Sequence, residues 1–268
     1  MKILIRLCVV SGIVLWMLSA AAWGGVSASK GTQTGGISPT IIPEAPDKVF
    51  NIMMRDRIEI QNMIKDYLYS KKGVTTPFTS GRFPDKQKKI RQDFVYLASI
   101  IRDPVLANLL HIVQANFERI CDLMRQPYTP QNLSVILYYG DMIANSLKQS
   151  ATSVYTAKPD IVLLYDLRYH INEVAIYYVI QNEERENDRT IALLQKALGQ
   201  LEQEIKRLTQ QSSQTSETRR GIQKISLLWD TLKHLCHSEG AGDLPLVVYR
   251  TTRLLDKAVV ELLNPAKE

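Results

Sequence analysis

The sequence predicts an all-α protein made of two tandem up-and-down four-helix bundles. Apolar residues recur at spacings of three and four along most of the 268 residues, which is typical of helices that bury one face. Prolines, glycines and polar breaks divide this pattern into eight segments of helix length. The second half of the chain repeats the first at an offset of 111 residues, and a period this long indicates duplicated domains rather than a solenoid.

The first bundle is expected over residues 47–156. It follows residues 29–46, whose content of Gly, Ser, Thr and Pro predicts a disordered linker. Asp103 offers an N-cap carboxylate and Pro104 a first-turn proline to the third helix, and Pro130 opens the fourth. Short connections favour the up-and-down order. The expected helices cover about residues 46–70, 85–102 and 104–126, and a fourth begins at residue 130.

The second bundle is expected over residues 157–265. Only Ala157, Lys158 and Pro159 interrupt the apolar pattern at the junction, and proline is tolerated in the first turn of a helix. We therefore expect the last helix of the first bundle to continue almost directly into the first helix of the second. The other helices of this bundle are expected over residues 190–210, 222–237 and 245–263.

Residues 1–28 have the pattern of a secretory signal peptide. Lys2 and Arg6 form a basic start, residues 7–22 are apolar, and residues 26–28 are small, as signal cleavage requires. The mature protein is then expected in the periplasm or outside the cell. An uncleaved membrane anchor is the competing interpretation, because the apolar run approaches the roughly 17 residues that span a bilayer.

Charge and motifs exclude several classes of function. Removal of Lys2 and Arg6 with the signal lowers the formal net charge from +6 to +4, which is spread along the chain and disfavours nucleic-acid binding. The sequence has no Gly-rich phosphate loop, nucleophile elbow or His-Glu metal motif. We therefore expect no enzyme activity, cofactor or metal site. Cys121 and Cys236 stay open to two interpretations, a disulfide and two free thiols.

Two arginines, Arg57 and Arg168, stand on apolar helical faces at equivalent positions of the two copies. A buried guanidinium needs a carboxylate, a bound anion or a wet cavity, because an unpaired buried charge is too costly to keep. Two interpretations of Arg57 remain open: an ion pair with Asp141 of the fourth helix, and the binding of an anion or a partner. Arg55 and Lys65 of the same helix are expected to be solvated.

The segment from Asn51 to Leu68, with the sequence NIMMRDRIEIQNMIKDYL, resembles the first helix of the N-terminal domain of type IV pili methyl-accepting chemotaxis transducers, the PilJ-type domain. That family opens with Asn and continues with Arg-x-Arg, a Gln four residues later, a Lys after four more, and Tyr-Leu. The same residue types stand here at Asn51, Arg55, Arg57, Gln61, Lys65, Tyr67 and Leu68.

The second copy resembles a degenerate repeat of this domain, because Val162, Asp166 and Ile176 replace the Asn, the first Arg and the Lys. Related sensor domains of nitrate and nitrite sensor kinases bind a small anion between the first helices of two subunits, through the equivalent arginine region. The ligand-binding residues that the resemblance implies are Asn51, Arg55, Arg57, Gln61 and Lys65 of the first copy and Arg168 and Asn172 of the second.

The resemblance thus implies an exported, sensor-like module that binds a small anion or a pilus-related component and signals through an envelope, pilus or chemotaxis partner protein. The alternative is a structural or adaptor protein of an envelope assembly with no small-molecule ligand. The membrane is a partner only if the signal stays uncleaved. Sensor domains of this kind dimerise through their first helix, so a homodimer and a monomer that pairs its own two copies both remain open.

Overall fold

The structure, a computed structural model, describes residues 46–74, 83–182, 188–210, 215–237 and 244–264. The elements in these ranges are all helices, which confirms the expected all-α class. The expected signal peptide, and all of the expected linker except Pro46, lie outside the described residues. The helices are α2 (Pro46–Lys71), α3 (Phe83–Ile100), α4 (Pro104–Arg125), α5 (Pro130–Val154), α6 (Pro159–Gln181), α7 (Asp188–Thr209), α8 (Ser216–His237) and α9 (Leu244–Leu263).

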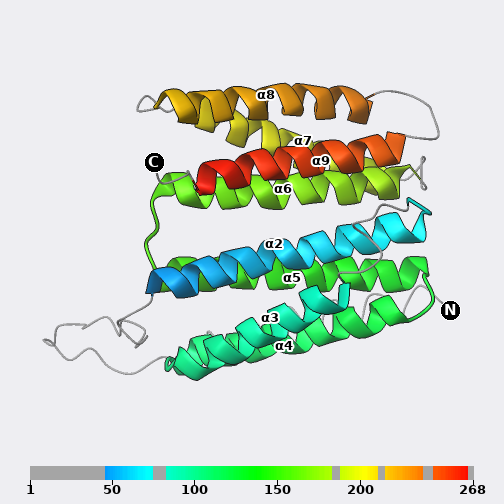
Figure 1. Cartoon of the computed structure of the whole chain (residues 1–268). Coiled ribbons are helices and arrows are strands. Elements are labelled where there is room, and N and C mark those ends of the chain that lie inside the picture. Colours follow the sequence, from blue (N-terminus) through cyan, green and yellow to red (C-terminus); the bar gives the residue numbers. More distant parts are fainter. Residues whose placement is uncertain (1–45, 75–82, 183–187, 211–214, 238–243, 265–268) are drawn as a thin grey trace, which may run out of the picture. The chain divides into compact units, whose positions relative to one another are not determined.

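The helices form two four-helix bundles in tandem (Figure 1). In the first bundle, α2 packs on α3 and α5, and α4 packs on the same two helices, so the four helices close a ring. In the second bundle, α6 packs on α7 and α9, and α8 packs on the same two helices. Each helix therefore packs on its neighbours in sequence, as up-and-down order requires, and the predicted architecture is confirmed.

Caps and prolines set the helix starts that the sequence predicts. The Asp103 carboxylate accepts a hydrogen bond from the backbone N–H of Leu106 at 2.8 Å, ahead of α4. The Thr129 hydroxyl accepts one from the backbone N–H of Asn132 at 3.1 Å, ahead of α5. These side chains satisfy N–H groups that the first turn of a helix leaves without a helical partner.

The link between the bundles is a reversal, and the expectation of an almost continuous helix is wrong. α5 ends at Val154, and the backbone is extended at Tyr155 (φ −146°, ψ 129°) and at Lys158 (φ −57°, ψ 138°). The residue before a proline is pushed out of the helical region, so Pro159 places the break at Lys158. α6 then runs back past the first bundle, in the same direction as α2 (Figure 1).

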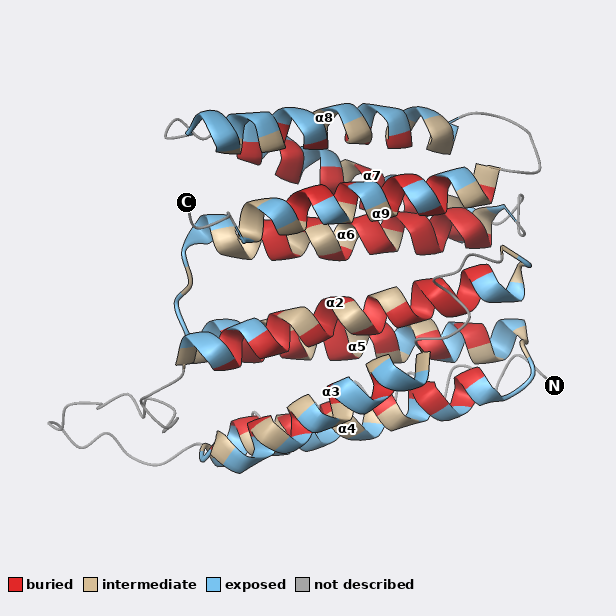
Figure 2. Ribbon diagram, viewed as in Figure 1, coloured by how far each residue is buried: buried red, intermediate tan, exposed pale blue. Residues whose placement is uncertain are grey.

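The two bundles meet along α2 and α6, the first helix of each, and belong to one compact unit. Both helices carry buried residues on nearly all sides, as expected for helices with neighbours all round (Figure 2). The Tyr69 hydroxyl of α2 donates a hydrogen bond to the backbone oxygen of Ala175 in α6 at 3.1 Å. The pairing of first helices, expected either between two chains or within one, occurs here within one chain.

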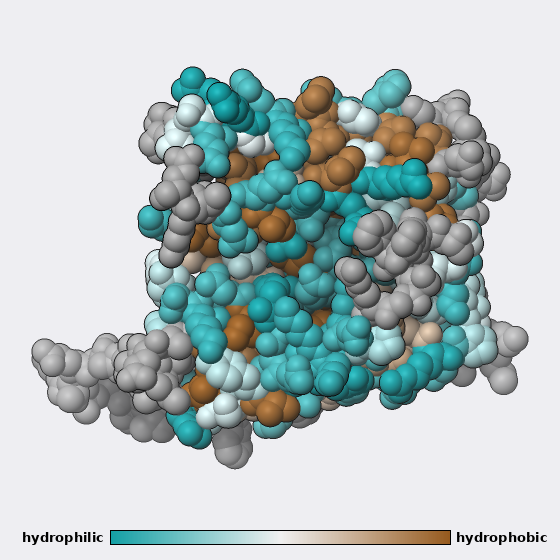
Figure 3. Space-filling model, viewed as in Figure 1, coloured by the Kyte–Doolittle hydropathy of each residue, from teal (hydrophilic) through white to brown (hydrophobic). Residues whose placement is uncertain are grey.

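The outer surface is chemically uneven. On the face shown in Figure 3, hydrophilic side chains cover much of the first bundle and hydrophobic ones gather over the second, while exposed hydrophobic side chains such as Val95 and Val105 also occur on the first bundle. Leu227 of α8 and Leu254 of α9 are exposed on the second bundle. Among the described helices, none combines the length and the hydropathy needed to cross a membrane.

Candidate functional site

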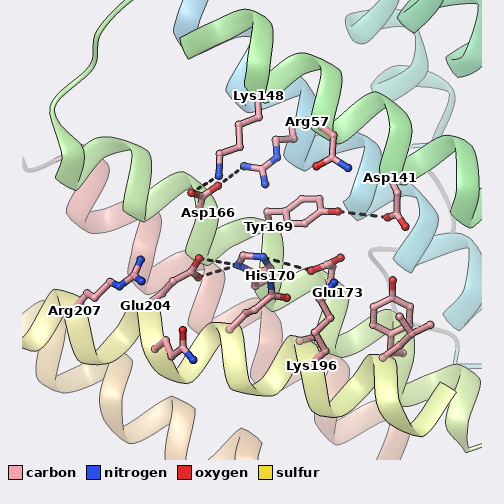
Figure 4. A pocket seen from close by; sticks show the side chains of 16 residues that line it. Arg57, Asp141, Lys148, Asp166, Tyr169, His170, Glu173, Lys196, Glu204 and Arg207 are labelled. Carbon is pink, nitrogen blue, oxygen red and sulfur yellow. Dashed lines mark hydrogen bonds and ion pairs between the residues drawn. The ribbon is translucent and has the colours of Figure 1, made fainter. Parts of the chain in front are cut away.

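A polar pocket of about 500 Å³ lies where the bundles meet, with α2 and α5 on one side and α6 and α7 on the other (Figure 4). Its wall carries charged side chains of both signs together with tyrosines. The charged side chains drawn in Figure 4 include Arg57, Lys148, Asp166, Asp141, Glu173 and Glu204.

Arg57 reaches this pocket from α2 and is almost fully buried, with 3% of its surface exposed. Its Nη1 donates a hydrogen bond to Asp166 Oδ1 of α6 at 2.7 Å, and its guanidinium lies 4.1 Å from the centroid of the Tyr169 ring. Its Nε has no hydrogen-bond partner among the residues that the structure describes. The expected pair with Asp141 is therefore wrong, because α6 supplies a carboxylate closer to the guanidinium than α5 does.

Asp166 is shared by two cations. The ammonium group of Lys148, on α5, donates to Asp166 Oδ2 at 2.7 Å while Arg57 occupies Oδ1. Burial disfavours the charged form of Asp166, but the two cations outweigh it and hold the pKa of this carboxyl below its ordinary value. One carboxylate thus faces two positive charges, and this end of the pocket carries an excess positive charge.

The other end of the pocket carries carboxylates. The Tyr169 hydroxyl makes a long hydrogen bond, 3.5 Å, to Asp141 Oδ1. Glu173 lies 3.6 Å from the Nε2 of His170, whose Nδ1 contacts Glu204 at 2.9 Å. Burial raises the pKa of both Asp141 and Glu173, because neither is paired as closely as Asp166.

Among the ligand-binding residues that the resemblance implies, Arg57 is the one that lines this pocket. Asn51 and Arg55 line a second pocket of about 500 Å³ between α2 and α3. There Arg55 donates to Asp93 Oδ2 at 2.6 Å, and Asn51 Oδ1 accepts a hydrogen bond from the Tyr165 hydroxyl at 3.2 Å. Of the residues that the resemblance implies, Asn51 and Arg55 therefore lie on one face of α2 and Arg57 on another.

Lys65, Asn172 and Arg168 form a hydrogen-bonded group between the bundles. The ammonium group of Lys65 donates to Asn172 Oδ1 at 2.6 Å and to Asn62 Oδ1 at 3.0 Å. The Asn172 amide donates to the backbone oxygen of Arg168, and the Arg168 guanidinium pairs with Asp256 of α9 at 2.7 Å. These contacts tie α2, α6 and α9 together.

The expectation that Lys65 is solvated is wrong, since only 2% of its surface is exposed. Burial lowers the pKa of its ammonium group. Arg55 is about one-third exposed, so it is only partly solvated. Gln61 is buried, and its amide nitrogen faces Gly140 of α5.

Sequence reasoning missed Lys148, Tyr169 and Glu173 as pocket residues. The one available signal was Asp166, which stands where the repeat has Arg55 in the first copy. An acid at that register, on a helix expected to pair with α2, is the natural counter-ion for a buried arginine. Comparison with protein-family models, with curated proteins and with solved structures gave no match.

Proposed function

We propose that this chain is an exported, sensor-like ligand-binding module whose small acidic ligand occupies the pocket between the bundles. The observation that carries the proposal is the arrangement at Asp166, where Arg57 and Lys148 share one carboxylate at the wall of a cavity of about 500 Å³. An acidic group of a ligand would balance the second cation. Charge-assisted hydrogen bonds of this kind are the strong ones.

The position of the pocket suits a sensor. It lies beside the contact of α2 with α6, and it also touches α5 and α7, so an occupant bridges both bundles. A ligand shifts a conformational equilibrium only if it binds one conformation more tightly than the other. A ligand that contacts both bundles would bind differently to two arrangements of one bundle against the other. The PilJ-type resemblance of residues 51–68 supports the same function, because it implies an anion bound beside paired first helices.

The remaining parts of the proposal come from the N-terminus and the resemblance. Residues 1–28 act as a signal peptide and direct export to the periplasm or the exterior. The ligand-bound state is then passed to a partner protein of the envelope, of a type IV pilus or of a chemotaxis system.

A second candidate is a structural or adaptor protein of an envelope assembly. The observation that favours it is the ion pair itself, because Arg57 already has a carboxylate partner inside the chain. Exposed hydrophobic side chains on the second bundle, such as Leu227 and Leu254, give a surface on which another protein could pack.

Thermal unfolding of the purified protein with nitrate, acetate and phosphate separates the two candidates. A ligand at about a hundred times its dissociation constant adds roughly 2.7 kcal/mol to stability. We expect at least one of these anions to raise the melting temperature of the wild type and not that of Arg57→Ala, each compared with the same variant without ligand.

Arg168→Ala is the matched control. Arg168 is the equivalent arginine of the second copy, but it pairs with Asp256 and does not line the pocket. We expect this variant to be less stable than the wild type yet to keep the anion-dependent rise. Absence of any response in the wild type, or equal responses in the two variants, would favour the adaptor.

A further inference from the structure

The two ends of the pocket are joined by a single side chain, Tyr169 of α6. The Arg57 guanidinium lies 4.1 Å from the centroid of its ring, and its hydroxyl lies 3.5 Å from Asp141 Oδ1 (Figure 4). One tyrosine side chain therefore contacts both the positive end and the acidic end of the pocket.

The carboxylates at the acidic end lack close cationic partners. No basic side chain in the described part of the chain forms an ion pair with Asp141, although Lys196 of α7 faces it across the pocket. Glu173 has the ring of His170 at 3.6 Å, and that ring is also bonded to Glu204. Buried carboxylates in this condition favour a cation that comes from outside the chain.

A second, independent feature is the Tyr177 hydroxyl. This side chain is 8% exposed, it lines the pocket beside Glu173, and it has no hydrogen bond to any residue that the structure describes. Because Tyr177 lines the pocket, its hydroxyl oxygen is available to accept a hydrogen bond from a ligand there.

We infer that the ligand is a zwitterion of the amino-acid class, with its acidic group at Arg57 and Lys148 and a charged amine at Asp141 and Glu173. The inference rests on the proposed function, because it assigns the second half of the same ligand. An ammonium group donates three hydrogen bonds, which two carboxylates and the Tyr177 oxygen accept.

A metal ion does not fit this end as well. Within the described ranges, no group of three or more His, Cys, Asp or Glu side chains is placed to hold one. An amine needs only hydrogen-bond acceptors, and the carboxylates in the wall of the pocket supply them.

Titration calorimetry with matched probes tests the inference. The zwitterions are glycine, β-alanine and γ-aminobutyrate, and each is compared with the unsubstituted acid and the alkylamine of the same length. We expect one zwitterion to bind at least about ten times more tightly than its matched acid, a difference of about 1.4 kcal/mol. In the double variant Asp141→Asn, Glu173→Gln this preference should disappear while the matched acid still binds.

Glu118→Gln is the control, because Glu118 lies on α4, pairs with Arg91 and does not line the pocket. It should keep the preference for the zwitterion. Equal affinity for the acid and the zwitterion would overturn the inference of a zwitterionic ligand, but it would leave the proposal of an acidic ligand standing. Binding of the alkylamine alone, or of no probe, would overturn both.

Discussion

Arg57 of α2 and Asp166 of α6 form an ion pair of 2.7 Å that connects the two bundles. Asp166 stands in the second copy where Arg55 stands in the first, 111 residues earlier. The equivalent arginine of the second copy, Arg168, does not make the reciprocal contact and pairs with Asp256 of its own bundle instead. The two copies have therefore become complementary rather than identical at their interface, and the polar pocket lies beside this one asymmetric pair.

Removal of Asp166 should destabilise the protein more than removal of Arg57. Asp166→Asn leaves a buried guanidinium without a carboxylate, which costs about 3 to 5 kcal/mol. Arg57→Ala leaves Asp166 with Lys148 as a partner, so we expect a loss of about 2 kcal/mol, as for one hydrogen bond to a charged group. Urea unfolding of the two single variants and the double variant measures both values and the coupling between them.

Lys148→Ala is the control for this cycle. Lys148 is 38% exposed, and an ion pair at that exposure contributes about 0 to 1 kcal/mol. A larger loss for Lys148→Ala than for Arg57→Ala would show that Lys148 is the main counter-ion of Asp166.

Gly140 and Gly199 should respond oppositely to alanine. A Cβ at Gly140 would lie 2.6 Å from Ile64 Cδ1 on α2, whereas a Cβ at Gly199 would meet no other side chain within 4 Å in the described part of the chain. We expect Gly140→Ala to lose about 1 to 3 kcal/mol through overpacking and Gly199→Ala to gain up to about 1 kcal/mol through helix propensity.

Denaturant unfolding measures both changes. Addition of Ile64→Val to Gly140→Ala should recover part of the loss, because it shortens the side chain that the new methyl group meets. If both alanine variants were more stable than the wild type by the same amount, α2 and α5 would not approach closely at Gly140.

Most of the fold can be predicted from the sequence because its signals are local. The cap at Asp103, and the prolines that open α4, α5 and α6, fix helix starts without reference to the rest of the chain. The reversal at Lys158 could not be predicted in this way. A proline in the first turn fits a continuing helix as well as a new one, and the packing of the bundles decides between them.

The site can be predicted only in part, for a related reason. A buried arginine at residue 57 is visible from helical periodicity. Periodicity does not identify its partner, because α6 carries buried residues on nearly every side and the pattern does not say which face meets α2. Only the register of the repeat points to Asp166. The same limit hides the burial of Lys65, whose ammonium group contacts Asn172 of α6 and Tyr249 of α9 as well as its own helix.

The thiols of Cys121 and Cys236 should be unreactive in the folded protein. Both are free, they lie on α4 and α8 of different bundles, and burial raises the pKa of each to about 12. The reactive thiolate is therefore scarce at pH 8. Iodoacetamide labelling followed by peptide mass spectrometry should show slow alkylation in buffer and fast alkylation in urea. Detection of a Cys121–Cys236 disulfide in the non-reduced digest would contradict the structure.

Lys65 should make stability rise with pH in the alkaline range. Its folded-state pKa is lowered by burial, against which the nearby carboxylates of Asp66 and Asp256 act, while the cations Lys86 and Arg253 add to the lowering. Between the folded-state pKa and the ordinary value of 10.5, the unfolded chain binds more protons at this site than the folded chain does. The free energy of unfolding therefore increases with pH across that window and is constant below it, as far as Lys65 is concerned.

Lys65→Met removes this contribution and adds a cost that does not depend on pH, because Asn172 Oδ1 loses its donor. Urea unfolding of the wild type and Lys65→Met from pH 7 to pH 10 should give a difference in unfolding free energy that shifts in favour of the wild type as pH rises. Titrating tyrosines affect both proteins alike and cancel in the difference. Lys88→Met, at an exposed position of α3, is the control and should give a constant difference. A constant difference for Lys65→Met as well would mean that the Lys65 ammonium group reaches solvent.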